Sequence, residues 1–201
     1  MLQDHYQKIV RGWKLKAIAK KVRAGILLKG VSKELVMEAL SYTRPKNAVE
    51  LFGLLSMRVF RGGELKEDLG LQSVKKVTTA FTKKLADAFC SSTAATDLHT
   101  YIYHAVGEGS AAEASGDVLL GNEHATRVTG SQTHGATSNI YRTLRTYAAV
   151  SAFTAIEHGI FNIITTSAGT LLDRSLVGTP PTLITGDEVE YTYELTINSE
   201  T

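Results

Sequence analysis

The sequence predicts a mainly β fold: an antiparallel β-sandwich or barrel with an N-terminal helical arm and one additional helix, an α+β chain overall. Three observations predict it. Short runs of alternating apolar and polar residues fill positions 98–197, and glycines and small polar residues separate these runs. Residues 1–50 instead place apolar side chains at helical spacing. We therefore expect a basic helical arm over 1–50 and a β-rich domain over 51–201.

The arm is expected to form two helices within residues 8–40. An apolar stripe through Trp13 and Ala17 marks one face of the first helix. Gly30 is expected to end that helix, and Ser32 has the residue type and position of an N-cap for a second.

Residues 51–71 are expected to form a β-hairpin, because the Gly62-Gly63 pair separates two extended runs. A third helix should cover 79–90, with Thr78 or Thr79 as its N-cap. The single cysteine, Cys90, excludes an internal disulfide and a Cys-based zinc site, and its apolar neighbours predict that it is buried.

The predicted sandwich occupies 98–197. Its strands are expected at 100–106, 126–133, 140–147, 149–153, 156–161, 171–177 and 188–197, with a glycine-rich loop over 107–121. The last strand has the clearest alternation. It turns apolar residues to the core, and Glu188, Glu190 and Glu194 to an acidic row that faces solvent or a partner.

The charge of the 201-residue chain is divided unevenly. Residues 1–90 hold 18 of the 22 Lys and Arg but 8 of the 20 Asp and Glu, a formal charge of +10. Residues 91–201 hold 4 and 12, a charge of −8. Surfaces of opposite sign suit different neighbours, or copies of one chain. No apolar run approaches the ~18 residues of a membrane span and no signal peptide precedes the arm, so we expect a protein made in a cytosol.

The sequence predicts no catalytic, metal-binding or cofactor-binding motif. Residues 107–112 match G-x-G-x-x-A, but the following residues have no apolar helical stripe and include two acidic groups, which favours a plain glycine loop. The six histidines lack metal-site spacing, and Glu157 and His158 should point to opposite faces of a strand. Asp187 and Glu188 lie in a predicted turn with no sign of burial. We expect no enzyme, cofactor or small-molecule substrate.

The basic arm has several possible uses. Its lysines could be solvated, could dock on an acidic protein, or could bind nucleic acid or a membrane surface; protein docking is the favoured interpretation. The residues expected to bind a partner are Arg11, Trp13, Lys14, Lys16, Lys20, Lys21 and Arg23 of the arm, with Glu188, Glu190 and Glu194 of the last strand.

Three groups of segments, in this order, carry a family resemblance. The first is YHAVGEGSAAEA at 103–114, and the second is RVTGSQT at 127–133 with SNIYRT at 138–143. The third is IEHGIF at 156–161, GTLLDRS at 169–175 and GDEVEYTY at 186–193. On these segments the chain from Tyr101 to Ile197 resembles a family of tailed-bacteriophage virion proteins. Residues 51–90 look similar more loosely, and the resemblance does not extend to 1–50.

The resemblance implies a structural component of the phage particle that carries no catalytic residues. The expected role is a capsid decoration (cement) protein that binds the major capsid protein, other virion proteins or copies of itself, within a virion assembled in the host cytoplasm. The alternatives are a tail, collar or fibre-attachment component, and a nucleic-acid-binding protein that uses the basic helices.

Overall fold

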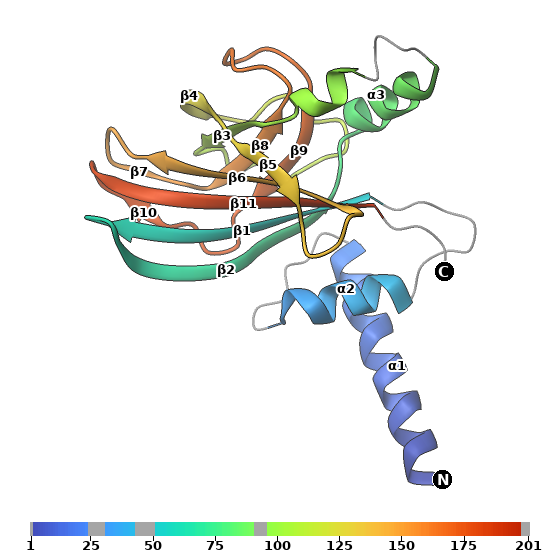
Figure 1. Ribbon diagram of the computed structural model, residues 1–201. Helices are drawn as coiled ribbons and strands as arrows, with labels where there is room; N and C mark the ends of the chain where they lie inside the picture. The colour runs from blue at the N-terminus through green and yellow to red at the C-terminus, as the bar shows by residue number, and fades with distance from the viewer. Residues whose placement is uncertain (1, 24–30, 43–50, 91–95, 198–201) are drawn as a thin grey trace.

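The chain folds as a β-sandwich-like α+β protein in the computed structural model, which describes residues 2–23, 31–42, 51–90 and 96–197 (Figure 1). The described helices are α1 (Leu2–Arg23), α2 (Lys33–Tyr42), α3 (Thr79–Cys90) and the 3₁₀ helix η1 (Thr96–Thr100). The described strands are β1 (Leu51–Arg61), β2 (Glu64–Lys76), β3 (Tyr103–Gly107), β4 (Glu123–Thr129), β5 (Ser131–His134), β6 (Ile140–Ala148), β7 (Phe153–Thr154), β8 (Glu157–Phe161), β9 (Leu171–Leu176), β10 (Thr182–Leu183) and β11 (Asp187–Ile197). The predicted fold class is confirmed.

Two antiparallel sheets form the body. The larger has the strand order β2-β1-β11-β6-β5 and the smaller β4-β3-β8-β9, while β7 and β10 form a short separate pair. The strand predicted over 126–133 is split, because the chain passes from one sheet to the other at Gly130. A Cβ at that glycine would stand 2.3 Å from Thr143 Oγ1 and 2.6 Å from His104 Nε2, so the crossing needs a residue without a side chain.

The core lies between the sheets. On β1, Leu55, Met57 and Val59 are buried, and Val189 and Tyr191 lie beside them on the neighbouring strand β11. Val106 of β3, in the smaller sheet, belongs to the same cluster. The alternation predicted for the last strand is confirmed from Glu188 to Tyr193, where the odd-numbered residues are buried and the even-numbered ones are not. Beyond Tyr193 the prediction is wrong, since Glu194 and Thr196 are buried as well and Ile197 is exposed.

The predicted hairpin is present and longer than expected. Gly62 and Gly63 have φ of 60° and 82°, the left-handed region that a two-residue hairpin turn requires at both positions. The return strand, β2, continues to Lys76, with register shifts along its pairing to β1.

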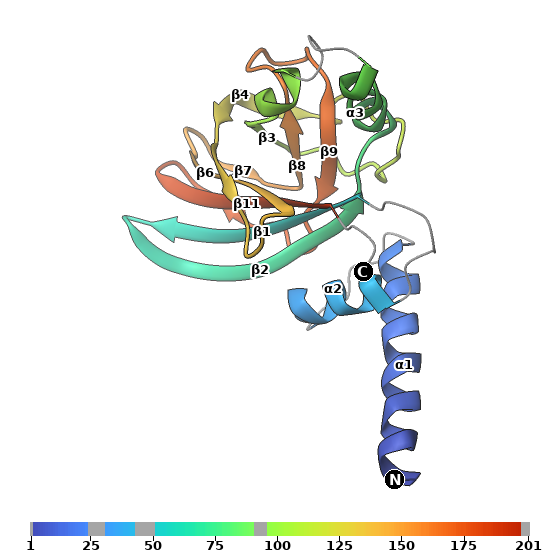
Figure 2. The same ribbon diagram turned by 45° about the vertical axis from the view of Figure 1, so that its right-hand side comes forward.

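The two N-terminal helices lie against the outer face of the larger sheet. Leu15, Ala19 and Val22 of α1 and residues of α2 share one apolar cluster with Phe52 and Leu54 of β1. From this root α1 projects away from the body in both views (Figures 1 and 2). The cluster thus crosses the boundary expected at residue 50, so the root of the arm belongs to the folded body.

Some predictions about the helices are confirmed and others are wrong. Ser32 caps α2, because its Oγ accepts a hydrogen bond from Leu35 N at 3.3 Å. The apolar stripe predicted through Trp13 and Ala17 is wrong, since both residues are exposed and the buried residues Leu15, Ala19 and Val22 lie on the other side of the helix. Gly30 lies outside the described residues.

Helix α3 has the predicted bounds and packs through its first turns only. Thr78 caps it by accepting a hydrogen bond from Phe81 N at 3.1 Å, and Phe81 is buried. The helix then extends beyond the sandwich, so Phe89 is 85 % exposed. The burial predicted for Cys90 is wrong for the same reason, because Cys90 is exposed.

Candidate functional site

The outward side of α1 carries most of the predicted partner-binding residues. Trp13 is 69 % exposed. All four lysines expected to bind a partner are exposed as well, namely Lys14, Lys16, Lys20 and Lys21. The ammonium groups of these lysines form no hydrogen bond or ion pair with any residue that the structure describes. This set of Trp13 and four lysines is called the basic face below.

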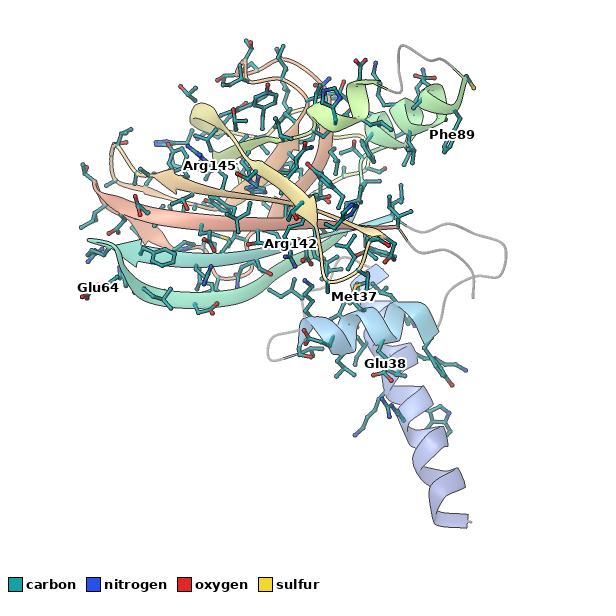
Figure 3. The ribbon with its side chains drawn as sticks, viewed as in Figure 1. Met37, Glu38, Glu64, Phe89, Arg142 and Arg145 are labelled. Carbon is teal, nitrogen blue, oxygen red and sulfur yellow. The ribbon has the colours of Figure 1, made fainter. Side chains whose placement is uncertain are left out.

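The remaining two basic residues differ from the basic face. Arg11 donates two hydrogen bonds to Glu38 Oε1, at 3.0 Å from Nε and 2.6 Å from Nη2, and so ties α1 to α2. Figure 3 shows Glu38 on α2 at this junction. The side chain of Arg23 lies outside the described residues. Arg11 is therefore engaged within the chain.

The acidic row of β11 is mostly occupied by cations of the same chain. Arg58 of β1 donates to Glu190 Oε1, with Nε at 2.8 Å. Glu194 is almost fully buried and pairs with Arg142 Nε at 2.8 Å and with Lys33 at the start of α2. The structure thus places Glu194 in a contact between the sheet and the helical root, and leaves Glu188 exposed.

The ionisation of Glu194 follows from this contact. Burial alone would raise the pKa of its carboxyl group, but hydrogen bonds from Lys33 and Arg142 outweigh that effect and hold the pKa below its ordinary value. The carboxylate is therefore charged at neutral pH and stabilises the position of α2 on the sheet.

The carboxylate at the start of β11 was expected in an unburied turn, and this prediction is wrong. Asp187 is 1 % exposed and forms a bidentate pair with Arg61, at 2.6 Å and 2.8 Å. The hydrogen bond from Arg61 lowers the pKa of Asp187. The pair fixes the hairpin to the first residues of β11.

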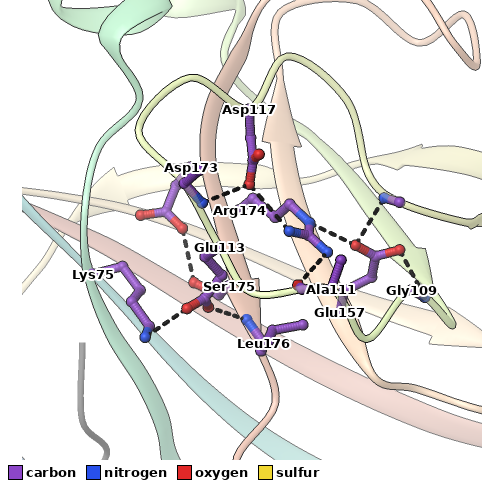
Figure 4. Close-up of polar contacts among 12 residues, drawn as sticks. Lys75, Gly109, Ala111, Glu113, Asp117, Glu157, Asp173, Arg174, Ser175 and Leu176 are labelled. Carbon is purple, nitrogen blue, oxygen red and sulfur yellow. Dashed lines mark hydrogen bonds and ion pairs between the residues drawn. The ribbon is translucent and has the colours of Figure 1, made fainter.

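The glycine-rich loop after β3 is shaped by Glu157. Its carboxylate is fully buried and accepts hydrogen bonds from the backbone N–H of Gly109 at 2.9 Å, Gly121 at 3.0 Å and Asn122 at 2.8 Å, and from Arg174 Nε at 2.7 Å (Figure 4). An anion bound by this loop would need the same N–H groups. The protein's own carboxylate fills that place, which agrees with the plain-loop interpretation.

A second buried polar group lies beside this loop and was missed from the sequence. Ser175 Oγ donates to Asp173 Oδ1 at 2.7 Å (Figure 4). Tyr193 OH lies 3.3 Å from Asp173 Oδ2. Burial raises the pKa of Asp173 to about 7. Ser175 and Asp173 are 0 % and 1 % exposed, so substrate cannot reach this pair in the present conformation.

Two histidines from different strands meet in the centre of the sandwich. His104 Nδ1 lies 3.0 Å from His158 Nε2, His104 Nε2 lies 3.0 Å from Thr143 Oγ1, and Tyr191 stacks on His158. Burial lowers the pKa of His104 to about 3 and lowers that of His158 well below its ordinary value. Both rings are neutral at pH 7. As predicted, Glu157 and His158 point to opposite faces of β8.

An apolar hollow of about 580 Å³ lies where α3, η1 and the β5–β6 hairpin meet the end of the larger sheet. Phe81, Leu98, Tyr141 and Leu195 are among its lining residues. Among the described residues, no three His, Cys, Asp or Glu side chains are arranged to hold a metal ion. None of the described helices is both long enough and apolar enough to cross a bilayer.

Comparison with known proteins identifies no relative. No protein-family model matches the chain, and neither the curated proteins nor the solved structures contain a match. The virion resemblance of 101–197 therefore stays a prediction, and the argument for function depends on the surfaces of this molecule.

Proposed function

We propose that this chain is a structural protein of a bacteriophage particle, and specifically a capsid decoration protein that stabilises the shell by protein–protein contact. The observation that carries the proposal is the basic face: an exposed tryptophan and four lysines that pair with no described residue, on a helix that projects from a β-sandwich. The resemblance of 101–197 supports a place in a phage particle, and the basic face supports a contact with another protein there.

The chemistry of the basic face suits an acidic protein surface. Exposed lysines bring a partner into register and speed association, but each exposed ion pair contributes at most about 1 kcal/mol. A large aromatic side chain such as Trp13 can supply the desolvated centre that such a contact needs. In a symmetric shell, many copies repeat the same weak contact, and their sum stabilises the particle.

The structure changes how the arm should be tested. Deleting the whole arm would uncover the buried side chains of Phe52 and Leu54, so loss of binding by that variant could reflect loss of folding. Substitutions on the basic face avoid this problem, because all of its side chains are exposed.

The test uses particles that lack the protein and adds the purified chain back. We expect the variant W13A/K16E/K20E to remain folded and to lose particle binding, while the matched charge change K83E/K84E on α3 leaves binding intact. Equal binding by W13A/K16E/K20E and by the unchanged chain would overturn the proposed contact.

Copy number separates the decoration role from its alternatives. A decoration protein should be present in hundreds of copies per particle, whereas a tail, collar or fibre-attachment part should be present in roughly 3 to 12, as symmetric rings demand. Nucleic-acid binding would instead show an affinity that falls steeply with salt, with a slope near −0.9 for each phosphate contact.

A further inference from the structure

We infer that the basic face of α1 docks on the hairpin end of a second copy of this chain, in a head-to-tail contact. The hairpin end is the part of the body around the β1–β2 turn and the start of β11. It comprises Glu64, Leu65, Glu67, Val150, Ile184 and Glu188. The inference rests on the proposed function, because it names the partner of the same basic face.

The hairpin end has the opposite charge to the basic face. Glu64, Glu67 and Glu188 are exposed, and no hydrogen bond or ion pair to another described residue engages their carboxylates. The cations Arg58 and Arg61 of this region are already paired with Glu190 and Asp187. Three carboxylates without a partner among the described residues are therefore available to the four lysines of the basic face. Lys66 is an exposed cation that lies among these carboxylates.

The hairpin end also exposes apolar side chains that the fold leaves uncovered. Leu65 is 52 % exposed, and cross-strand pairing places it in one row with Phe60 and Glu188. Nearby, Val150 is 74 % and Ile184 is 48 % exposed. A hydrogen bond from Gly186 N to Ala149 O, of 2.9 Å, joins the two loops that carry them. Apolar side chains with a carboxylate rim complement a tryptophan surrounded by lysines.

The two surfaces cannot meet within one molecule. Figure 3 shows Glu64 at the tip of the hairpin, at the far side of the body from α1, and Figure 2 gives the same separation from a second direction. The 22 residues of α1 span about 33 Å at 1.5 Å per residue, and the helix leads away from the sheet. The contact must therefore join different copies.

Head-to-tail joining has a geometric consequence. The surface used on one copy differs from the surface used on the next, so the contact is heterologous and repeats until it closes as a ring or continues as an open array. Either outcome suits a protein that covers a repeating shell.

The experiment measures association of the full chain by sedimentation velocity and by the fluorescence of Trp13, the single tryptophan of the sequence. At about 0.1 M salt, where the screening length is about 10 Å, we expect the mass to rise with concentration. We expect the Trp13 emission to shift to shorter wavelength over the same range. Raising the salt to about 1 M, where the screening length is about 3 Å, should reverse both changes.

Charge reversal identifies the two surfaces. We expect K16E/K20E and E64K/E188K each to weaken self-association by at least about tenfold, because each places like charges in the contact. The combined variant K16E/K20E/E64K/E188K should restore association, since both surfaces then have exchanged signs. Far-ultraviolet circular dichroism confirms that each variant is folded.

Two results would overturn the inference. The first is a monomer at all concentrations at low salt, with no shift of Trp13 emission. The second is association that K16E/K20E abolishes but E64K/E188K leaves intact, with no recovery in the combined variant. Neither result would by itself end the proposed function, because particle binding by a monomeric chain would still support a decoration role with another virion protein as partner.

Discussion

Acid should destabilise this protein through the histidine pair at the centre of the sandwich. His104 has a folded pKa of about 3, whereas an unfolded chain has its histidines near 6.5. The folded state therefore binds fewer protons than the unfolded state between these values. The contribution of His104 to the stability of the fold is complete above pH 6.5 and is lost as the pH decreases toward 3.

The magnitude follows from one proton at about 1.4 kcal/mol per pH unit. Between pH 6.5 and 4, His104 alone should remove about 3 kcal/mol of unfolding free energy, and His158 acts in the same direction. The neighbouring cation Arg145 also disfavours the charged form of His104, while Thr143 and Tyr191 are neutral.

One buried carboxyl group opposes this effect. Asp173 has a folded pKa of about 7 against an ordinary value of 3.8, so its contribution to stability is present at low pH and is lost as the pH rises from 3.8 to 7. Over pH 4–6.5 its slope is opposite to that of one histidine. We therefore expect the variant D173N to lose stability more steeply than the native chain as the pH falls through this range.

Urea unfolding, followed by circular dichroism at a series of pH values, measures these slopes. The variant H104Q/H158Q should no longer lose stability as the pH falls through this window. The exposed histidines provide the control, because H99Q/H134Q should behave as the native chain does. If H104Q/H158Q keeps the acid sensitivity of the native chain, the reasoning from the buried pair is refuted.

Three further predictions test the packing. G53A should destabilise by about 1–3 kcal/mol or more, because its Cβ would stand 2.1 Å from a buried carboxylate oxygen; G116A, where the Cβ meets nothing within 4 Å, should have little effect in the same urea titration. E157Q should cost about 1–3 kcal/mol and raise hydrogen exchange in the 107–122 loop, because it removes the charge that accepts the loop N–H groups and leaves the buried Arg174 with Asp117 as its remaining carboxylate partner; unchanged exchange there would contradict the role of Glu157. Cys90 should react with a thiol reagent in the folded protein as fast as in urea, whereas slow reaction would mean that it is covered.

The sequence predicted the elements whose signal is local. Alternation along 188–193, the Gly62-Gly63 turn and the caps at Ser32 and Thr78 each depend on a few neighbouring residues, and each is present in the structure. Local patterns failed where a helix meets the rest of the fold. The buried side of α1 is set by its contact with α2 and β1, which the spacing of apolar residues alone did not distinguish.

The polar groups of the interior could not be predicted for a related reason. His104 and His158 are 54 positions apart, and Glu157 gathers N–H groups from two ends of a long loop. Which residues they contact depends on the strand register and on the conformation of the loop, and neither can be read from a short sequence motif. The exposure of the basic face could be predicted, because its lysines pair with no described residue and so depend on no distant partner.

The pairing of β1 with β11 has a consequence for how the protein is made. Leu51 lies opposite Ile197, so β1 cannot complete its pairing with β11 until synthesis has passed residue 197. Until then, the apolar residues of α1, α2 and β1 lack their final support, and contacts so distant in sequence slow folding. We expect the nascent chain to depend on chaperones during this delay, and a chain truncated before 187 to be degraded or to aggregate.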